Sequence, residues 1–194
     1  MSAILLIFFS PLLLVFIIII FLQTKTNPIY TQKRGISLNK NTFNIYKLRT
    51  LYPSNETHNT KNPNILIQEN YAKSVIPCGA FLRKTSIDEI PQLINVLLGD
   101  MSLIGPRPLS FHDLNIIQHE SPNLYRRRDN LNVKPGISGY WQIFGDREKG
   151  IENLIEYDEY YEKNKSFLLD MFLMMMTIPL MLFARHTDAI VRKK

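Results

Sequence analysis

Residues 83–108 have the sequence RKTSIDEIPQLINVLLGDMSLIGPRP, which joins two adjacent carboxylates, a helical pattern and an arginine between prolines. Ser86 is a favourable helix N-cap, and its spacing to Glu89 matches a capping box. The pattern therefore predicts a helix that begins at Asp88 and Glu89 and ends at Gly99, a typical terminating residue. Its apolar residues recur at the spacing of one buried helix face: Ile90, Leu93, Ile94 and Leu97.

The carboxylates of Asp88 and Glu89 have two interpretations. Acidic residues are common in a first helical turn because they complement the helix dipole. A helix N-terminus also favours phosphate, and an ionised carboxylate there can attack phosphorus or bind Mg²⁺. Arg107 follows on a segment that Pro106 and Pro108 make stiff. The stretch therefore indicates a candidate site for phosphate chemistry, with the dipole interpretation as the alternative.

Length, charge and cysteine content bound the class of protein. The 194 residues, 45% of them hydrophobic, suffice for one domain with an appendage. The net charge of +6 suits an anionic partner, which can be nucleic acid, acidic lipid or a nucleotide diphosphate. The single cysteine, Cys78, excludes an internal disulfide and fits a reducing compartment.

Residues 3–22 are apolar apart from Ser10 and Pro11, and the run is long enough to span a bilayer. A cleaved signal peptide is disfavoured because neither a basic segment nor a small-residue cleavage site flanks the run. A straight transmembrane helix and a bent membrane helix remain. Pro11 removes a backbone donor and predicts a kink, and the Ser10 hydroxyl can bind the carbonyl that is freed.

Residues 29–33 and 42–50 are predicted to form two strands of a hairpin. Lys47 and Arg49 lie two positions apart and therefore share one face of the second strand. They either hold phosphates or form a solvated basic edge.

A loop rich in Pro and Gly is predicted for residues 134–142. Its candidates for nucleotide binding are Lys134, Gly136, Trp141 and Gln142. Gly136 allows close backbone approach, whereas Trp141 either stacks on a base or packs in the core.

Helices are predicted for residues 109–119 and 151–163. The apolar residues 167–184 are expected to form a helix that is buried or lies at a membrane interface. The basic run at 126–128 indicates a solvated face, or a surface for membrane or phosphate.

The order of these blocks resembles the bacterial sugar transferases, the monotopic phosphoglycosyl transferases that begin surface glycan assembly. The central stretch carries the resemblance. PIYTQKRG at 28–35 and FNIYKLRT at 43–50 resemble two upstream blocks, and VKPGISGYWQ at 133–142 and residues 158–170 resemble two downstream blocks.

The resemblance implies a mostly helical α+β fold. Residues 1–24 would form a re-entrant membrane helix. Residues 25–194 would form a catalytic domain on the cytoplasmic face of the bacterial inner membrane, with a small β-hairpin and interfacial amphipathic helices around the carboxylate-bearing helix N-terminus. The implied reaction moves a sugar phosphate from a UDP-sugar to polyprenyl (undecaprenyl) phosphate and releases UMP. Membrane lipid is the third expected partner, nucleic acid is not expected, and a homo-oligomer remains open.

The family's roles map onto residues of this sequence. The resemblance makes Asp88 the nucleophile, which forms a covalent phosphosugar intermediate, and Glu89 the Mg²⁺ ligand, with Asp88 as the second candidate ligand. Arg107 corresponds to the phosphate-binding arginine. Further candidates for phosphate contacts are Lys47, Arg49 and Gln92.

Two other classes of function compete. One is a catalytically silent membrane scaffold of a glycan assembly complex, which the presence of Asp88, Glu89 and Arg107 argues against. The other is a membrane-tethered nucleic-acid binder, which the charge allows but for which the sequence shows no recognised module.

Overall fold

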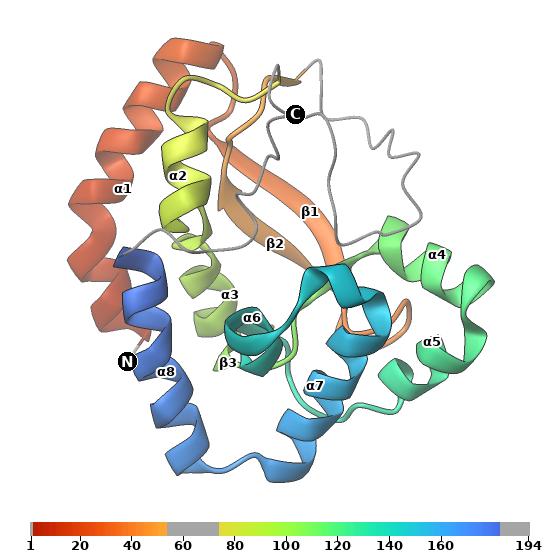
Figure 1. Cartoon of the computed structure of the whole chain (residues 1–194). Coiled ribbons are helices and arrows are strands. Elements are labelled where there is room, and N and C mark those ends of the chain that lie inside the picture. The colour runs from red at the N-terminus through yellow and green to blue at the C-terminus, as the bar shows by residue number, and fades with distance from the viewer. Residues whose placement is uncertain (1, 54–73, 183–194) are drawn as a thin grey trace.

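The computed structural model describes residues 2–53 and 74–182, which form a mostly helical α+β fold (Figure 1). The α-helices are α1 (Ser2–Thr24), α2 (Gly79–Thr85), α3 (Gln92–Leu98), α4 (Phe111–Glu120), α5 (Pro122–Asp129), α6 (Tyr140–Phe144), α7 (Gly150–Asn164) and α8 (Phe167–Leu182). The strands are β1 (Ile29–Gly35), β2 (Phe43–Leu48), β3 (Ser102–Ile104), β4 (Leu109–Ser110) and β5 (Gly136–Ser138). The predicted fold class is confirmed at this level.

The predicted hairpin is present, and it places the Pro106–Pro108 segment. Strands β1 and β2 pair antiparallel, and β4 pairs antiparallel with the other edge of β1. In that second pairing Arg34 lies opposite Ser110. Because β4 begins directly after Pro108, this pairing brings Arg107 close to the end of β1.

Residues 134–142 are not one continuous loop, so that prediction is wrong for the strand and the helix that form within them. Strand β5 pairs parallel with β3, with Gly136 opposite Ser102, and α6 begins at Tyr140. The close approach explains the glycine, because a Cβ at Gly136 would lie 2.1 Å from the Gly105 nitrogen. Backbone pairing with a distant strand is a long-range effect that the local Pro/Gly composition does not reveal.

The start of the central helix is a second correction. Asp88 lies in a 3₁₀ turn, η2 (Ile87–Glu89), and α3 starts only at Gln92. Ser86 has a left-handed backbone (φ 56°) and makes no side-chain cap, so the predicted capping box is absent. Pro91 explains the difference, because it lacks an N–H and its ring would clash with the carbonyl four residues earlier. Gly99, at φ 84°, ends α3 as predicted.

The buried face of α3 is more polar than its apolar spacing predicted. Leu93 is buried, but Ile94 is 38% exposed and Leu97 is 49% exposed. Gln92 and Asn95 take buried positions instead. The expectation of one continuous buried apolar face is therefore wrong at Ile94 and Leu97.

Asn95 binds α3 to the hairpin. Its Oδ1 accepts the N–H of Tyr46 at 3.1 Å, and its Nδ2 donates to the carbonyl of Asn44 at 2.8 Å. Among the residues that the structure describes, strand β2 is an edge strand of the sheet β2-β1-β4. The buried Asn95 amide therefore serves as the partner of two partly buried backbone groups on this edge of the sheet.

Helix α1 is continuous over 23 residues although Pro11 lies inside it. The Ser10 hydroxyl donates to the carbonyl of Ile7 at 2.7 Å. In a regular α-helix the Ile7 carbonyl would accept from the N–H of residue 11, and Pro11 has no N–H. The expected side-chain substitute is thus present. By length and composition α1 can cross a membrane.

Large apolar side chains are exposed on α1 and α8. Helix α8 is buried at Leu173, and its Asp170 accepts a hydrogen bond from Tyr161 on α7 at 2.7 Å. Several of its other apolar side chains are exposed, so the alternative of a fully buried helix is wrong. The most exposed of these side chains on the two helices are Ile4, Ile7, Phe8, Phe167, Leu168 and Met175.

We expect Asn95→Ala to lower the free energy of unfolding by about 2 kcal/mol, because two partly buried backbone groups of β2 lose their partners. Denaturant unfolding in detergent measures the change. Asn115→Ala is the matched control, since its amide caps the carbonyl of Phe111 at an exposed position. Equal effects of the two substitutions would show that Asn95 does not hold α3 against β2.

Candidate functional site

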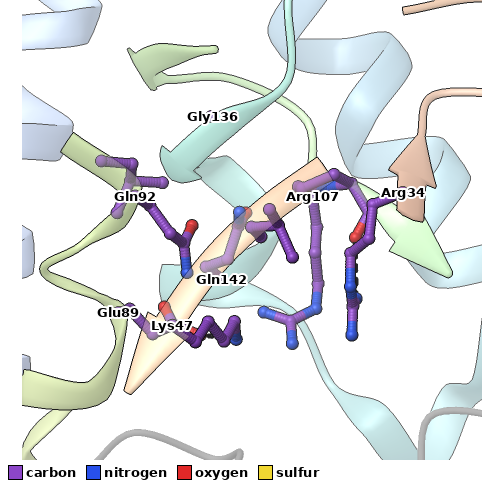
Figure 2. A pocket seen from close by; sticks show the side chains of 10 residues that line it. Arg34, Lys47, Glu89, Gln92, Arg107, Gly136 and Gln142 are labelled. Atoms are coloured by element: carbon purple, nitrogen blue, oxygen red, sulfur yellow. Dashed lines mark hydrogen bonds and ion pairs between the residues drawn. The ribbon is translucent and has the colours of Figure 1, made fainter. Parts of the chain in front are cut away.

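One pocket gathers side chains from distant parts of the chain (Figure 2). Strands β1 and β2, the turn η2, helix α3, the Pro106–Pro108 segment, strand β5 and helix α6 each contribute to its wall. The residues that line it are Arg34, Ile45, Lys47, Glu89, Gln92, Arg107, Pro108, Gly136, Ile137 and Gln142.

Lys47 and Glu89 form an ion pair in this pocket. The Lys47 Nζ lies 2.5 Å from Oε1 of Glu89, and both side chains are largely buried, at 17% and 12% exposure. The pair joins β2 to the η2 turn, which is why the carboxylate points toward the hairpin in Figure 2. Partial burial strengthens such a pair because solvent screens it less.

Arg49 does not share the position of Lys47, although both were predicted on one face. Strand β2 ends at Leu48, and the Arg49 Nε donates to the carbonyl of Asn27 at 2.8 Å. Its guanidinium lies over the ring of Tyr30. As the structure describes the pocket, Arg49 lies outside it.

Arg34 is a pocket residue that the sequence reasoning did not select. Its Nη1 donates to the carbonyl of Pro108 at 3.0 Å, and its Nε and Nη2 donate to Oε1 of Gln32. Figure 2 shows its side chain beside that of Arg107. Burial lowers the pKa of Arg34, and the positive charge of Arg107 lowers it further. The available signal was its place in the QKRG block on β1.

The charges in the pocket do not balance. Arg34, Lys47 and Arg107 contribute three positive charges, and Glu89 is the carboxylate among the lining residues. Two arginines side by side repel each other unless an anion lies between them. Guanidinium groups bind phosphate oxygens through pairs of parallel donors. The pocket therefore suits a ligand with at least two negative charges.

Gln142 points to a polar ligand as well. Among the residues that the structure describes, neither Nε2 nor Oε1 of its buried amide has a hydrogen-bond partner. A buried amide without partners costs about 1–3 kcal/mol. Because Gln142 lines the pocket, a bound ligand is the natural partner for this amide.

The other three candidates for nucleotide binding lie in different places. Gly136 lines the pocket, whereas the Lys134 Nζ donates to the carbonyl of Gly99 at 2.7 Å, at the end of α3. Trp141 is 2% exposed and packs in the core with Leu114 and Leu154. Of its two interpretations, core packing is the one that the structure shows.

Asp88 is buried at 7% exposure and precedes Glu89 in the η2 turn, but it does not belong to the described pocket lining. Within residues 2–53 and 74–182, no group of three or more His, Cys, Asp or Glu side chains could hold a metal ion. Mg²⁺ is nevertheless often held by one or two carboxylates together with substrate phosphates. Asp88 and Glu89 are adjacent carboxylates in the η2 turn, which is the kind of ligand that this mode of binding uses.

The basic run at 126–128 is not simply a solvated face. Arg128 is fully buried, and it donates from Nη2 to the carbonyl of Arg107 at 2.5 Å. Arg127 is partly exposed and pairs with Glu159. The prediction of a solvated face is therefore wrong for Arg128, because tertiary contacts bury this one side of α5.

Comparison with known proteins gives matches over most of the chain. Residues 1–184 match the family described as Bacterial sugar transferase. The uncharacterized sugar transferase EpsL of Bacillus subtilis is 34% identical over 152 residues, which are 78% of this chain and 69% of EpsL.

Two relatives have names that state a reaction. The UDP-N-acetylgalactosamine-undecaprenyl-phosphate N-acetylgalactosaminephosphotransferase of Aeromonas hydrophila is 36% identical over 174 residues, 88% of this chain and 39% of the relative. The undecaprenyl-phosphate galactose phosphotransferase of Salmonella typhimurium is 38% identical over 108 residues, 54% of this chain and 21% of the relative. The chain thus spans less than half the length of these two proteins.

We expect the pocket to bind inorganic pyrophosphate, and Arg34→Gln to weaken this binding about tenfold, equivalent to roughly 1.4 kcal/mol. The loss follows from removing a guanidinium that would make a charge-assisted hydrogen bond to the ligand. Titration calorimetry measures the dissociation constant. Arg127→Gln removes an arginine that is outside the described pocket lining and should bind like the unaltered protein. An Arg34→Gln protein with unaltered affinity would exclude Arg34 from the anion site.

Proposed function

This chain belongs to the bacterial sugar transferase family, and we propose that it moves a sugar phosphate from a UDP-sugar to polyprenyl phosphate, with UMP as the second product. The family is one of sugar transferases, and residues 1–184 match its model. The names of the Aeromonas and Salmonella relatives support undecaprenyl phosphate as the acceptor. In the cell, the product would begin assembly of a surface glycan.

The observation that carries the proposal is the pocket with three cations and one carboxylate. A nucleoside diphosphate sugar brings two negatively charged phosphates, which matches the excess of positive charge. Phosphoryl transfer depends mostly on positioning and on neutralising charge. Arg34, Lys47 and Arg107 would supply that charge from three different segments of the chain. The amide of Gln142 would bind a polar atom of the same ligand.

We assign the nucleophile to Asp88. One of its carboxylate oxygens attacks the phosphorus that carries the sugar. An O–P bond to Asp88 forms, the bond from this phosphorus to the bridging oxygen breaks, and UMP leaves with that oxygen and its electron pair. An oxygen of the lipid phosphate then attacks the same phosphorus. The O–P bond to Asp88 breaks, which restores the carboxylate.

We assign Mg²⁺ binding to Glu89, with Asp88 as its neighbour. When bound, the ion would neutralise charge on the diphosphate, which otherwise repels an attacking carboxylate. Lys47 is the residue that holds Glu89 in the structure at 2.5 Å. Its ammonium fixes the carboxylate on the pocket side of η2 and adds positive charge for the substrate.

We further propose that α1 enters and leaves the membrane on one face, the cytoplasmic face of the inner membrane. Pro11 lies near the middle of the helix, and the Ser10 hydroxyl satisfies the carbonyl that Pro11 leaves without its donor. This arrangement allows a bend without an unsatisfied polar group in lipid. The exposed apolar side chains of α8 would rest on the same membrane surface.

The proposal predicts a burst of UMP without lipid. Detergent-purified protein with Mg²⁺ and a panel of UDP-sugars should release up to one equivalent of UMP, gain the mass of one phosphosugar and stop. Polyprenyl phosphate should then restart turnover. Asp88→Asn nearly preserves shape but removes the nucleophile, so both the burst and the mass increase should disappear.

Glu89→Gln separates the two carboxylates in the same assay. Because Glu89 binds the metal and does not attack, this variant should recover part of its activity at high Mg²⁺, whereas Asp88→Asn should not. Turnover that requires the lipid from the start, with no adduct on Asp88, would show direct transfer between the substrates. No UMP from any sugar, with or without lipid, would refute the proposed function itself.

The bent helix predicts that residue 1 and Lys25 lie on the same, cytoplasmic side. A cysteine added before Met1, in a Cys78→Ser background, should stay unlabelled by an impermeant maleimide in intact cells and react after lysis. Pro11→Ala restores the backbone donor and should increase the fraction labelled from outside. Ready labelling of the Pro11 protein in intact cells would show that α1 spans the membrane.

A further inference from the structure

The Pro106–Pro108 segment has one backbone N–H, that of Arg107, because proline has none. Each carbonyl of the segment accepts a hydrogen bond from a residue distant in the sequence. Pro106 accepts from the N–H of Gly136 at 2.9 Å, and Pro108 accepts from Arg34 at 3.0 Å. The partners of Arg107 itself are two buried residues of α5 and α7.

Arg128 and Asp158 contact the peptide of Arg107 on both sides. Arg128 donates from Nη2 to the Arg107 carbonyl at 2.5 Å, and Asp158 accepts the Arg107 N–H. The two also pair with each other, with Nη1 of Arg128 2.7 Å from Oδ2 of Asp158. Their side chains are 0% and 2% exposed.

We propose that Arg128 and Asp158 form a clamp that positions Arg107, so that its guanidinium points into the pocket before the substrate arrives. The clamp depends on the proposed function in one respect, which is that Arg107 binds a substrate phosphate. Neither clamp residue lines the described pocket, so both act through Arg107 as positioning residues.

Removing the charges of Arg128 and Asp158 from water costs free energy, so stability alone does not explain why the pair is ionic. Burial raises the pKa of Asp158 to about 6, although the charge and hydrogen bond of Arg128 and the charge of Arg107 oppose the shift. Buried ion pairs can often be replaced by apolar residues without loss of stability. What an apolar pair cannot provide is a donor and an acceptor for the Arg107 peptide.

The geometry of the clamp requires an arginine. Arg128 reaches three acceptors at once, since its Nε also donates to the carbonyl of Ile36 at 2.7 Å. The planar fork of a guanidinium offers donors in three directions, whereas a lysine ammonium is a point charge on a flexible stem. Arg128 thereby connects the end of β1, the Arg107 segment and α7.

The same two helices supply a matched control. Arg127 and Glu159 form an ion pair with an N–O distance of 2.6 Å. Arg127 directly precedes Arg128, and Glu159 directly follows Asp158. The side chains of the control pair are 36% and 38% exposed, and in the described part of the chain Arg127 donates both Nε and Nη2 to Glu159 rather than to Arg107. Replacing this pair tests for general damage to the contact between α5 and α7.

The test replaces each pair by apolar residues. Arg128→Met with Asp158→Leu removes the clamp without leaving an unpaired charge, and Arg127→Met with Glu159→Leu is its control. Hydrogen exchange is followed at the Arg107 amide, and pyrophosphate affinity and UMP release are measured. A third comparison repeats the pair substitution in an Arg107→Lys background.

We expect exchange at Arg107 to accelerate about tenfold or more and both pyrophosphate affinity and kcat/KM to fall about tenfold, with the control unaltered. In the Arg107→Lys background the same pair substitution should change kcat/KM less than about twofold, because the positioned group is absent. If the apolar pair does not fold, Arg128→Lys keeps the buried charge but loses the fork, and it should show the same pattern.

Unaltered exchange at Arg107, or an equal fall of kcat/KM in both backgrounds, would overturn the clamp and leave Arg128 and Asp158 as structural residues. Exchange and pyrophosphate binding do not depend on turnover. An unaltered protein that releases no UMP would therefore refute the proposed reaction, while faster exchange together with weaker pyrophosphate binding would still support the clamp.

Discussion

The hydrogen bonds to the backbone of residues 106–108 are the constraint on which the rest of the site depends. Gly136, Arg128 and Arg34 donate to three successive carbonyls, and they come from β5, α5 and β1. Two prolines leave this segment unable to join a regular sheet or helix. Distant parts of the chain must therefore satisfy its polar groups, and in doing so they assemble around Arg107.

The same constraint explains why the pocket carries an excess of positive charge. Arg34 serves the backbone of Pro108 and lines the pocket at once, so it is held beside Arg107 by a structural hydrogen bond. Like charges held together in this way raise the free energy of the empty site. A phosphate ligand would relieve that repulsion on binding, and the free energy released would add to the affinity for the anion.

Features fixed by neighbouring residues could be predicted from the sequence. The hairpin, the helix end at Gly99 and the hydrogen bond from Ser10 to Ile7 each follow from local chemistry. The start of α3 also follows from local chemistry, because Pro91 disfavours a helix that begins before it, whatever the Ser86 pattern suggests. The family resemblance located Asp88, Glu89 and Arg107 by motif rather than by geometry.

Features set by long-range contacts could not be predicted. Arg127 and Arg128 are identical in type and adjacent, yet one is partly exposed and the other fully buried. Successive residues on a helix point about 100° apart, so the orientation of α5 against α7 decides which one is buried. Arg34 and Asn95 escaped selection for the same reason, since their partners lie 74 and about 50 residues away.

Packing of α1 connects the hydrophobic segment to the carboxylates. Leu13 and Ile20 on α1 share one core with Ile90, which directly follows the η2 turn, and with Leu93 on α3. Protein cores are close-packed and transmit displacement with little compression. The depth of α1 in a bilayer would therefore set the height of Asp88 and Glu89 above the lipid. An acceptor lipid would carry its phosphate at the membrane surface. A rigid connection would hold Asp88 at the depth of that phosphate, whereas a flexible tether would not fix this depth.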